Sequence, residues 1–159
     1  MAELRAALVA GGFERVSTVL QSGNVLLHAT ESEAAVSTSI RNTIEAAFGL
    51  RIGVVVRSAR ELAAIAVGNP FLTRAGPADP ATLHVAFLAQ QPTDTAVAML
   101  DPHRSPPDAF AVEGREVYLS YPNGSGRSRL TLSYIERTLA MQGTARNWRT
   151  VERLITLIA

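Results

Sequence analysis

Residues 83–88 read Leu-His-Val-Ala-Phe-Leu, and this apolar run opens the stretch of sequence that decides the fold. A short continuous apolar run predicts a buried strand. Residues 93–101 have the spacing of a short helix. Apolar and polar residues then alternate through 110–112 and 117–121, with a turn at Gly114. The order strand, helix, strand, strand begins a ferredoxin-like unit.

Two further helices are predicted after this stretch. The spacing of apolar residues predicts one helix over 128–140 and another over 147–158. The second half of the chain is therefore expected to run β-α-β-β-α-α. This is a ferredoxin-like order in which the closing strand is exchanged for a helix.

The first half carries the same kinds of element. In chain order, the predictions are a helix over 2–10, strands over 15–20 and 25–29, a helix from the capping box Thr30–Glu33 to Gly49, a strand over 52–56 and a helix from the capping box Ser58–Glu61. This order is ferredoxin-like without its opening strand.

We therefore expect an α+β protein of two ferredoxin-like halves, the first lacking its opening strand and the second ending in a helix. Residues 68–81 contain three Pro and two Gly, which predicts a linker. The halves are then expected over 1–67 and 82–159.

The composition is that of a globular protein, with 47% hydrophobic and 18% charged residues. Cysteine is absent, which excludes disulfides, thiolate catalysis and cysteine-ligated metals. The histidines, His28, His84 and His103, have no metal-ligand spacing, so we expect neither a metal nor a cofactor. Charges interrupt the first apolar residues, which is untypical of a signal peptide, and no apolar run reaches the ~20 residues that span a bilayer. We expect a cytoplasmic protein with no membrane partner.

Positive charge is concentrated at the C-terminal end, although the whole chain carries only +1. Residues 121–159 contain six Arg and two Glu, a net charge of +4, which leaves −3 for the rest of the chain. Every basic residue other than histidine is Arg, the side chain best suited to bidentate contact with phosphate or carboxylate.

The strongest candidate site is a Gly-containing loop that is predicted to open onto the helix at 128. Backbone amides at a helix N-terminus attract anions, and Gly permits close approach of a ligand. The loop matches neither the Walker A motif nor the nucleophile elbow. A strand-to-helix turn with solvent-facing Arg side chains is the alternative interpretation. The candidate residues are Asn123, Gly124, Gly126, Arg127, Ser128 and Arg129.

A second candidate precedes the last predicted helix, which Thr144 is expected to cap. Arg146 and Arg149 are three residues apart and would share a helix face, with Asn147 between them. Trp148 is either a stacking platform for a base or a core residue.

A third candidate is the hairpin tip, where Gln21, Ser22 and Asn24 offer polar groups. Simple turn chemistry is the alternative at this tip.

The chain resembles the bacterial family known as domain of unknown function 1697. The resemblance rests on stretches that follow one another in order, namely Met1–Ala6, Leu20–Val25, Asn69–Phe71, Leu83–Leu88, Tyr121–Ser128 and Thr144–Val151. The family pattern has a further strand and a Gly-containing loop before the position of Met1, so the resemblance implies that the opening strand is missing here. Neighbouring strands would then present unpaired ladder groups, which favours re-pairing or pairing with a second copy. The resemblance implies the fold and brings no agreed activity.

We expect the protein to bind a phosphate-bearing ligand, nucleic acid or a nucleotide, through the Arg and Gly residues of the first two candidates. Two alternatives stay open. One is an enzyme that acts on a small anionic metabolite, and the other is a structural protein that self-associates, for example as a homodimer. The pI of about 8.3 lies below the ~9 that is typical of dedicated nucleic-acid-binding domains.

Overall fold

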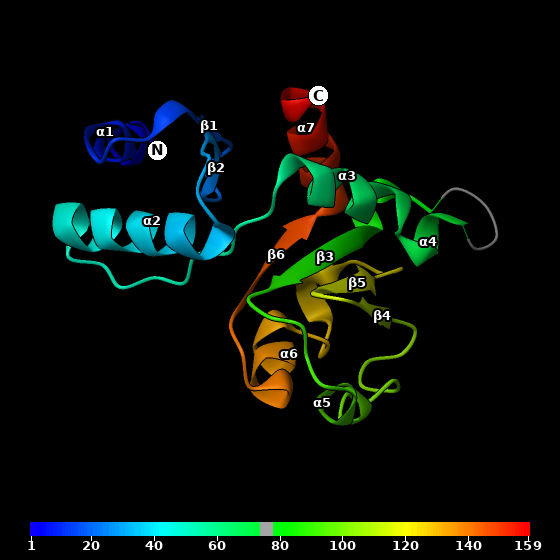
Figure 1. Cartoon of the computed structure of the whole chain (residues 1–159). Helices are drawn as coiled ribbons and strands as arrows, with labels where there is room; N and C mark the ends of the chain where they lie inside the picture. Colours follow the sequence, from blue (N-terminus) through cyan, green and yellow to red (C-terminus); the bar gives the residue numbers. More distant parts are fainter. Residues whose placement is uncertain (74–77) are drawn as a thin grey trace. The chain divides into compact units, whose positions relative to one another are not determined.

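The computed structural model describes residues 1–73 and 78–159, and their contacts divide the chain into two compact units (Figure 1). Unit 1 covers Met1–Ser58 and unit 2 covers Ala59–Leu157. The described part of the predicted linker 68–81 belongs to unit 2, and residues 74–77 lie outside the described residues. None of the helices in the described ranges is long and apolar enough to cross a membrane.

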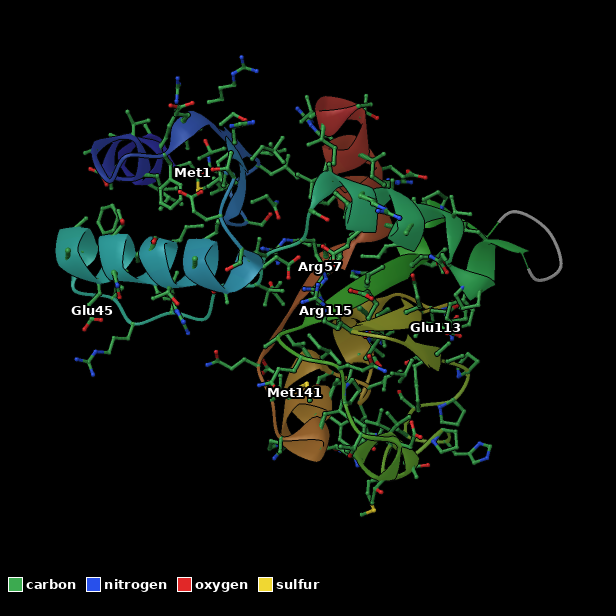
Figure 2. The ribbon with its side chains drawn as sticks, viewed as in Figure 1. Met1, Glu45, Arg57, Glu113, Arg115 and Met141 are labelled. Carbon is green, nitrogen blue, oxygen red and sulfur yellow. The ribbon has the colours of Figure 1, made fainter. Side chains whose placement is uncertain are left out.

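Helix α3 (Ala59–Val67) belongs to unit 2, whereas the sequence pattern places residues up to 67 in the first half. The Tyr118 hydroxyl donates a hydrogen bond to the carbonyl of Ile65 at 3.2 Å. The carboxylate of Glu61 pairs with the guanidinium of Arg115, which Figure 2 labels. Tyr118 and Arg115 both belong to unit 2, so these interactions hold the helix against that unit.

Unit 2 has the full ferredoxin-like order β-α-β-β-α-β, framed by helices. After α3 come α4 (Pro70–Thr73), η1 (Pro80–Thr82), β3 (Leu83–Leu88), α5 (Asp94–Ala98), β4 (Ala109–Glu113), β5 (Glu116–Ser120), η2 (Ser125–Arg127), α6 (Leu132–Leu139), β6 (Gly143–Asn147) and α7 (Trp148–Ile158). The sheet order is β4-β5-β3-β6, and every neighbouring pair is antiparallel.

The closing strand β6 corrects the prediction for the second half. This half does not exchange its closing strand for a helix, because β6 pairs with β3 before α7 begins. Its sequence, Gly-Thr-Ala-Arg-Asn, has no apolar alternation, so hydrophobic pattern alone gives no strand signal there. The strand forms because its backbone pairs with the edge of β3.

Both faces of the unit 2 sheet are covered. On one face, Ala86, Leu88, Val117 and Leu119 form a core with Ile135 of α6. Helices α3 and α7 lie on the opposite side of the sheet from α5 and α6 (Figure 1). The face of β3 and β5 that the first core leaves uncovered is thus also buried.

Unit 1 contains α1 (Ala2–Ala10), β1 (Glu14–Val19), β2 (Asn24–His28) and α2 (Glu33–Phe48). Its two antiparallel strands form a separate sheet, and Leu8, Val16 and Ile40 lie at the centre of the core. The α2 helix ends at Gly49 as predicted, where a φ of 68° suits glycine.

The cap of α2 differs from the predicted capping box. The hydroxyl of Ser32 accepts from the amide of Ala35 at 3.3 Å and caps the helix. The amide of Thr30 instead donates to the carboxylate of Glu31 at 3.0 Å. Thr30 therefore precedes the helix by more than the capping box requires.

The sequence predicts a strand over residues 52–56, and no sheet of the described chain contains them. Val54 and Val56 nevertheless pack against the core of unit 1, and the Ser37 hydroxyl donates to the carbonyl of Val54 at 3.0 Å. The apolar pattern thus correctly indicates packing against a core. The ladder that would make a strand is missing because no described strand lies beside this segment.

Candidate functional site

The Gly–Arg loop, which we define as Asn123–Arg129, connects β5 to α6 in unit 2. The helix begins at Leu132 and is capped by Thr131, whose hydroxyl accepts from the amide of Tyr134 at 3.2 Å. The predicted helix start at Ser128 is therefore wrong. The Ser128 hydroxyl instead accepts from the amide of Leu130 at 2.9 Å and closes a local turn.

The loop presents two guanidinium groups to solvent. Arg127 and Arg129 are exposed, and within the described residues neither side chain has a hydrogen-bond or ion-pair partner. The amides of Ser125 and Gly126 open the short turn η2, where no intrahelical acceptor exists for them. A Cβ added at Gly126 would meet no atom within 4 Å, so the space beside the loop is open.

The segment that contains Arg104 and Ser105 contacts the end of the loop. The amide of Arg129 donates to the Ser105 hydroxyl at 3.1 Å, and the Arg104 guanidinium donates to the carbonyl of Arg129 at 3.3 Å. Arg104 also lies 4.4 Å over the ring of Tyr134, which orients a third guanidinium beside the loop. The sequence does not indicate Arg104, because a partner 25 residues away carries no local pattern.

Acidic residues are also near. The carboxylate of Asp101 accepts from the amide of His103 at 2.8 Å, close to Arg104 in the chain. Burial, followed by the negative charge of Asp108, raises the pKa of the Tyr121 phenol to about 12. The surroundings of the loop therefore combine three Arg with two Asp.

Tyr121 anchors the start of the loop to its end. Its hydroxyl donates to the carbonyl of Leu130 at 2.8 Å, and its ring meets that of His84 edge-on at a centroid distance of 5.2 Å. Burial lowers the pKa of His84, so the neutral imidazole is favoured. The buried phenol therefore ties the start of the loop to its end, and the neutral imidazole packs against it.

The second candidate adopts a different structure from the one predicted. Asn147 caps α7, since its side-chain oxygen accepts from the amide of Arg149 at 3.0 Å, and Thr144 lies within β6. Arg146 lies on the strand and Arg149 on the helix, so they share no helix face. The side-chain amide of Asn147 also donates to the carbonyl of Ala81 at 2.9 Å.

The charges of this second candidate are engaged within the chain. The Arg149 guanidinium lies 3.4 Å from the carboxylate of Asp79, so it already has an anionic partner within the chain. Arg146 donates to the Thr144 hydroxyl at 2.6 Å and to the carbonyl of Ala145 at 2.8 Å, and burial lowers its pKa. Trp148 is 1% exposed and belongs to the core, so it cannot act as a stacking platform.

The two candidates nevertheless lie at one end of the same sheet. Leu83 at the start of β3 pairs with Ser120, and His84 pairs with Asn147. The Gly–Arg loop and the N-terminus of α7 therefore leave the sheet at the end where β3 begins.

The hairpin tip of unit 1 is explained by turn structure. Asn24 is buried, and its side-chain amide donates to the carbonyl of Val19 at 3.1 Å and to the Ser22 hydroxyl at 2.9 Å. Gln21 is exposed beside them. The polar groups of Ser22 and Asn24 thus serve the hairpin.

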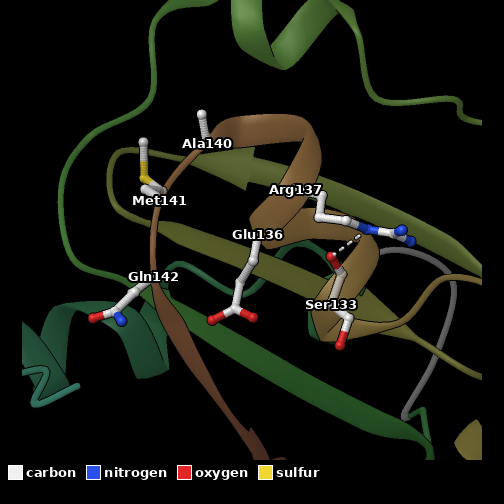
Figure 3. A pocket seen from close by; sticks show the side chains of 6 residues that line it. All are labelled: Ser133, Glu136, Arg137, Ala140, Met141 and Gln142. Atoms are coloured by element: carbon white, nitrogen blue, oxygen red, sulfur yellow. Dashed lines mark hydrogen bonds between the residues drawn. The ribbon is translucent and has the colours of Figure 1, made fainter. Parts of the chain in front are cut away.

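A hollow of about 450 Å³ runs along α6 and the turn into β6 (Figure 3). Its lining residues are Ser133, Glu136, Arg137, Ala140, Met141 and Gln142. Glu136 accepts from the amide of Gly143 at 2.9 Å, and Arg137 donates to the carbonyl of Ser133 at 3.4 Å. Because both charged side chains support local backbone, the hollow offers little to recognise an anion.

Comparison with known proteins identifies the family and the fold. The chain belongs to the family described as "Protein of unknown function (DUF1697)", which matches residues 1–118. The solved structure of the conserved bacterial protein SP0830 from Streptococcus pneumoniae is similar, with a TM-score of 0.73 and 17% identity over 99% of this chain and 87% of that one. No curated protein matches.

Proposed function

We propose that the protein binds a phosphate-bearing ligand, a nucleotide or a short stretch of nucleic acid, at the Gly–Arg loop. The observation that carries the proposal is the pair of exposed guanidinium groups of Arg127 and Arg129, which have no partner within the described residues. Guanidinium groups bind phosphate oxygens through charge-assisted hydrogen bonds. The amides of Ser125 and Gly126 add donors that can meet the same oxygens.

The arrangement around the loop limits the size of the ligand. The oriented guanidinium of Arg104 provides a third positive charge, while Asp101 and Asp108 reduce the local net charge. Both sheet faces of unit 2 are covered, so bases cannot stack on the sheet as they do on open nucleic-acid-binding sheets. These features favour a few phosphate groups over a long polyanion.

The experiment measures binding of a labelled single-stranded oligonucleotide and, separately, of ATP by fluorescence anisotropy and competition. Replacing both Arg127 and Arg129 with Ala is expected to weaken binding by at least about 100-fold, since hydrogen bonds to charged groups contribute about 1.5–3 kcal/mol each. The slope of log affinity against log salt is expected to flatten by about one for each guanidinium that no longer meets a phosphate.

Arg153→Ala is the matched control, because Arg153 is an exposed Arg that belongs to α7 and not to the loop. It is expected to leave affinity within about twofold, as most surface substitutions change little. Gly126→Ala is a second probe, since the open space beside Gly126 accepts a methyl group without disturbing the fold. Equal affinities for the wild type and the Arg127/Arg129 double variant would overturn the proposed site.

A further inference from the structure

His84 is a buried titratable group that the proposed phosphate site does not use. It is the second residue of β3, and its neighbours across the sheet are Leu119 of β5 and Asn147 of β6. The side chain is half-buried, and its Nδ1 atom is shielded from solvent without a hydrogen-bond partner within the described residues. Buried polar side-chain atoms usually have such a partner, so this nitrogen is an exception.

The imidazole of His84 lies against the residue that closes the Gly–Arg loop. The ring of Tyr121 meets it edge-on at a centroid distance of 5.2 Å. The Tyr121 hydroxyl donates to the carbonyl of Leu130 at 2.8 Å, and its amide donates to the carbonyl of Thr82 at 2.9 Å. A change at His84 is therefore felt next to a side chain that joins the loop to the sheet.

Protonation changes what this imidazole needs from its surroundings. A neutral imidazole carries its proton on one nitrogen, whereas an imidazolium carries an N–H on both. The charged form of His84 would therefore place an N–H on the buried Nδ1, for which the described residues provide no acceptor. Burial also withdraws water from the charge and lowers the pKa of His84. The charged ring is thus poorly accommodated while it stays packed against Tyr121.

The charged groups around His84 do not compensate for its burial. The phenol of Tyr121 stays neutral near neutral pH, because its pKa is about 12. The residue that faces His84 from β6 is the neutral Asn147, and the guanidinium of Arg149 pairs with Asp79. Burial is therefore what sets the direction of the shift in the pKa of His84. The other charged groups on the adjoining elements are Asp108, Arg129, Glu136, Arg137 and Arg146.

We propose that His84 is a pH switch for the Gly–Arg loop, in which protonation of the imidazole breaks its packing against Tyr121 and frees the loop from the end of the sheet. Above pH about 6.5 the imidazole is neutral whether the loop is held or freed, so the held loop keeps its full stability. Below this pH the freed state takes up a proton more readily, so opening becomes easier as the pH falls. The switch concerns the order of the loop and stands whether or not the loop binds phosphate.

Amide exchange of the full chain at pH 7.5 and pH 5, corrected for the intrinsic pH dependence of exchange, tests the switch. Protection of the loop amides is expected to fall by about threefold or more at pH 5, since one pKa unit corresponds to a tenfold change. Protection of β5 is expected to stay the same. Carboxylates remain mostly ionised at pH 5, so histidines are the groups that titrate. The amides to follow each donate a hydrogen bond in or beside the loop, and they are those of Tyr121, Gly124, Arg129 and Leu130.

The ring signal of His84 and two variants assign the response to this residue. In the wild type, the midpoint of the loop response is expected to coincide with that of the His84 imidazole, followed by NMR. His84→Gln is neutral at every pH and is expected to give equal loop protection at pH 5 and pH 7.5. His103→Gln is the matched control, because His103 is an exposed histidine of the same unit, and it is expected to keep the wild-type response.

Several results would overturn the switch, and two of them need no variant to fold. These two are loop protection that is unchanged between pH 7.5 and pH 5 in the wild type, and a loop midpoint that differs from that of the His84 ring. A loop response that persists in His84→Gln would assign it to another group. A loss of protection shared equally by β5 would show that acid destabilises the whole unit and not the loop.

Discussion

The two units carry a similar succession of elements, and they differ in how completely their sheets bury the same positions. In unit 2, β5 has a strand on either side, and its inward residues Val117 and Leu119 are fully buried. In unit 1, the matching strand β2 has one neighbour among the described residues, and Val25 and Leu27 remain half-buried. The helices that pack on the two sheets both present apolar faces. The difference teaches that a strand with a neighbour on either side and a helix-covered face buries its inward residues more completely than an edge strand does.

The largest expected effect compares matched leucines in the two sheets. Leu119→Ala is expected to lower the free energy of unfolding of unit 2 by about 2–5 kcal/mol, because the side chain is fully buried. Leu27→Ala is expected to cost unit 1 less than about 2 kcal/mol, because part of its surface already meets solvent. Urea unfolding followed by amide exchange, read separately for each unit, measures both. Equal losses would show that the two sheets bury their strands alike.

The second largest expected effect is a loss of stability at alkaline pH that is confined to unit 2. Burial, followed by the charges of Glu116 and Glu113, raises the pKa of Tyr118 to about 12, and burial with Asp108 does the same for Tyr121. A pKa raised in the folded state gives stability that is complete below the unfolded value near 10 and is lost as pH rises toward 12. All tyrosines belong to unit 2, so unit 2 should lose up to about 2–3 kcal/mol for each buried tyrosine over this range. Amide exchange at pH 9 and pH 11 tests this, with about half of the loss expected by pH 11, and a parallel loss in unit 1 would contradict it.

Helix caps provide a smaller and more local comparison. Ser32→Ala in unit 1 and Thr131→Ala in unit 2 are each expected to cost about 1 kcal/mol, since each hydroxyl accepts an amide hydrogen bond at its helix start. Thr30→Ala is the matched control in unit 1, because Ser32 and not Thr30 caps α2. Thermal unfolding by circular dichroism measures all three. A loss with Thr30→Ala as large as that with Ser32→Ala would favour a capping box that starts at Thr30.

The smallest expected effect concerns Asp79 and Arg149. Both side chains are well exposed, so Asp79→Asn is expected to change stability by less than about 1 kcal/mol. The same substitution releases the Arg149 guanidinium at the N-terminus of α7. If the Gly–Arg loop binds phosphate, Asp79→Asn is expected to strengthen oligonucleotide binding slightly in the anisotropy assay, because an internal carboxylate is removed from the same end of the sheet. Weaker binding would indicate that Asp79 supports the site.

Hydrophobic periodicity predicts most elements of both units. The helix with Val36, Ile40 and Ile44 and the strand at 83–88 form where the pattern places them, because their apolar faces have only one way to be buried. The α+β class and the family follow from the same stretches. Features that depend on a single side-chain contact are less predictable, and the caps of α2, α6 and α7 each fall on a residue other than the expected one.

Strand pairing is the main feature of the fold that the sequence pattern does not predict. Strand β6 forms from polar residues because β3 lies beside it, and the apolar residues 52–56 form no ladder because no described strand lies beside them. In the candidate site, the loop and its exposed Arg127 are predictable from local residues. The hydrogen bond from Arg104 to the loop and the ion pair of Arg149 with Asp79 are not predictable in this way, because each joins segments that are distant in sequence.

The burial of Trp148 has an optical consequence. The only tryptophan of the chain is 1% exposed and lies in unit 2, and unit 1 contains neither tryptophan nor tyrosine. Fluorescence emission excited near the red edge of protein absorption therefore reports on one unit and is blind to the other. An emission curve that looks like a single cooperative transition would describe unit 2 alone, and a tryptophan introduced into α2, for example Phe48→Trp, would make unit 1 visible by the same light.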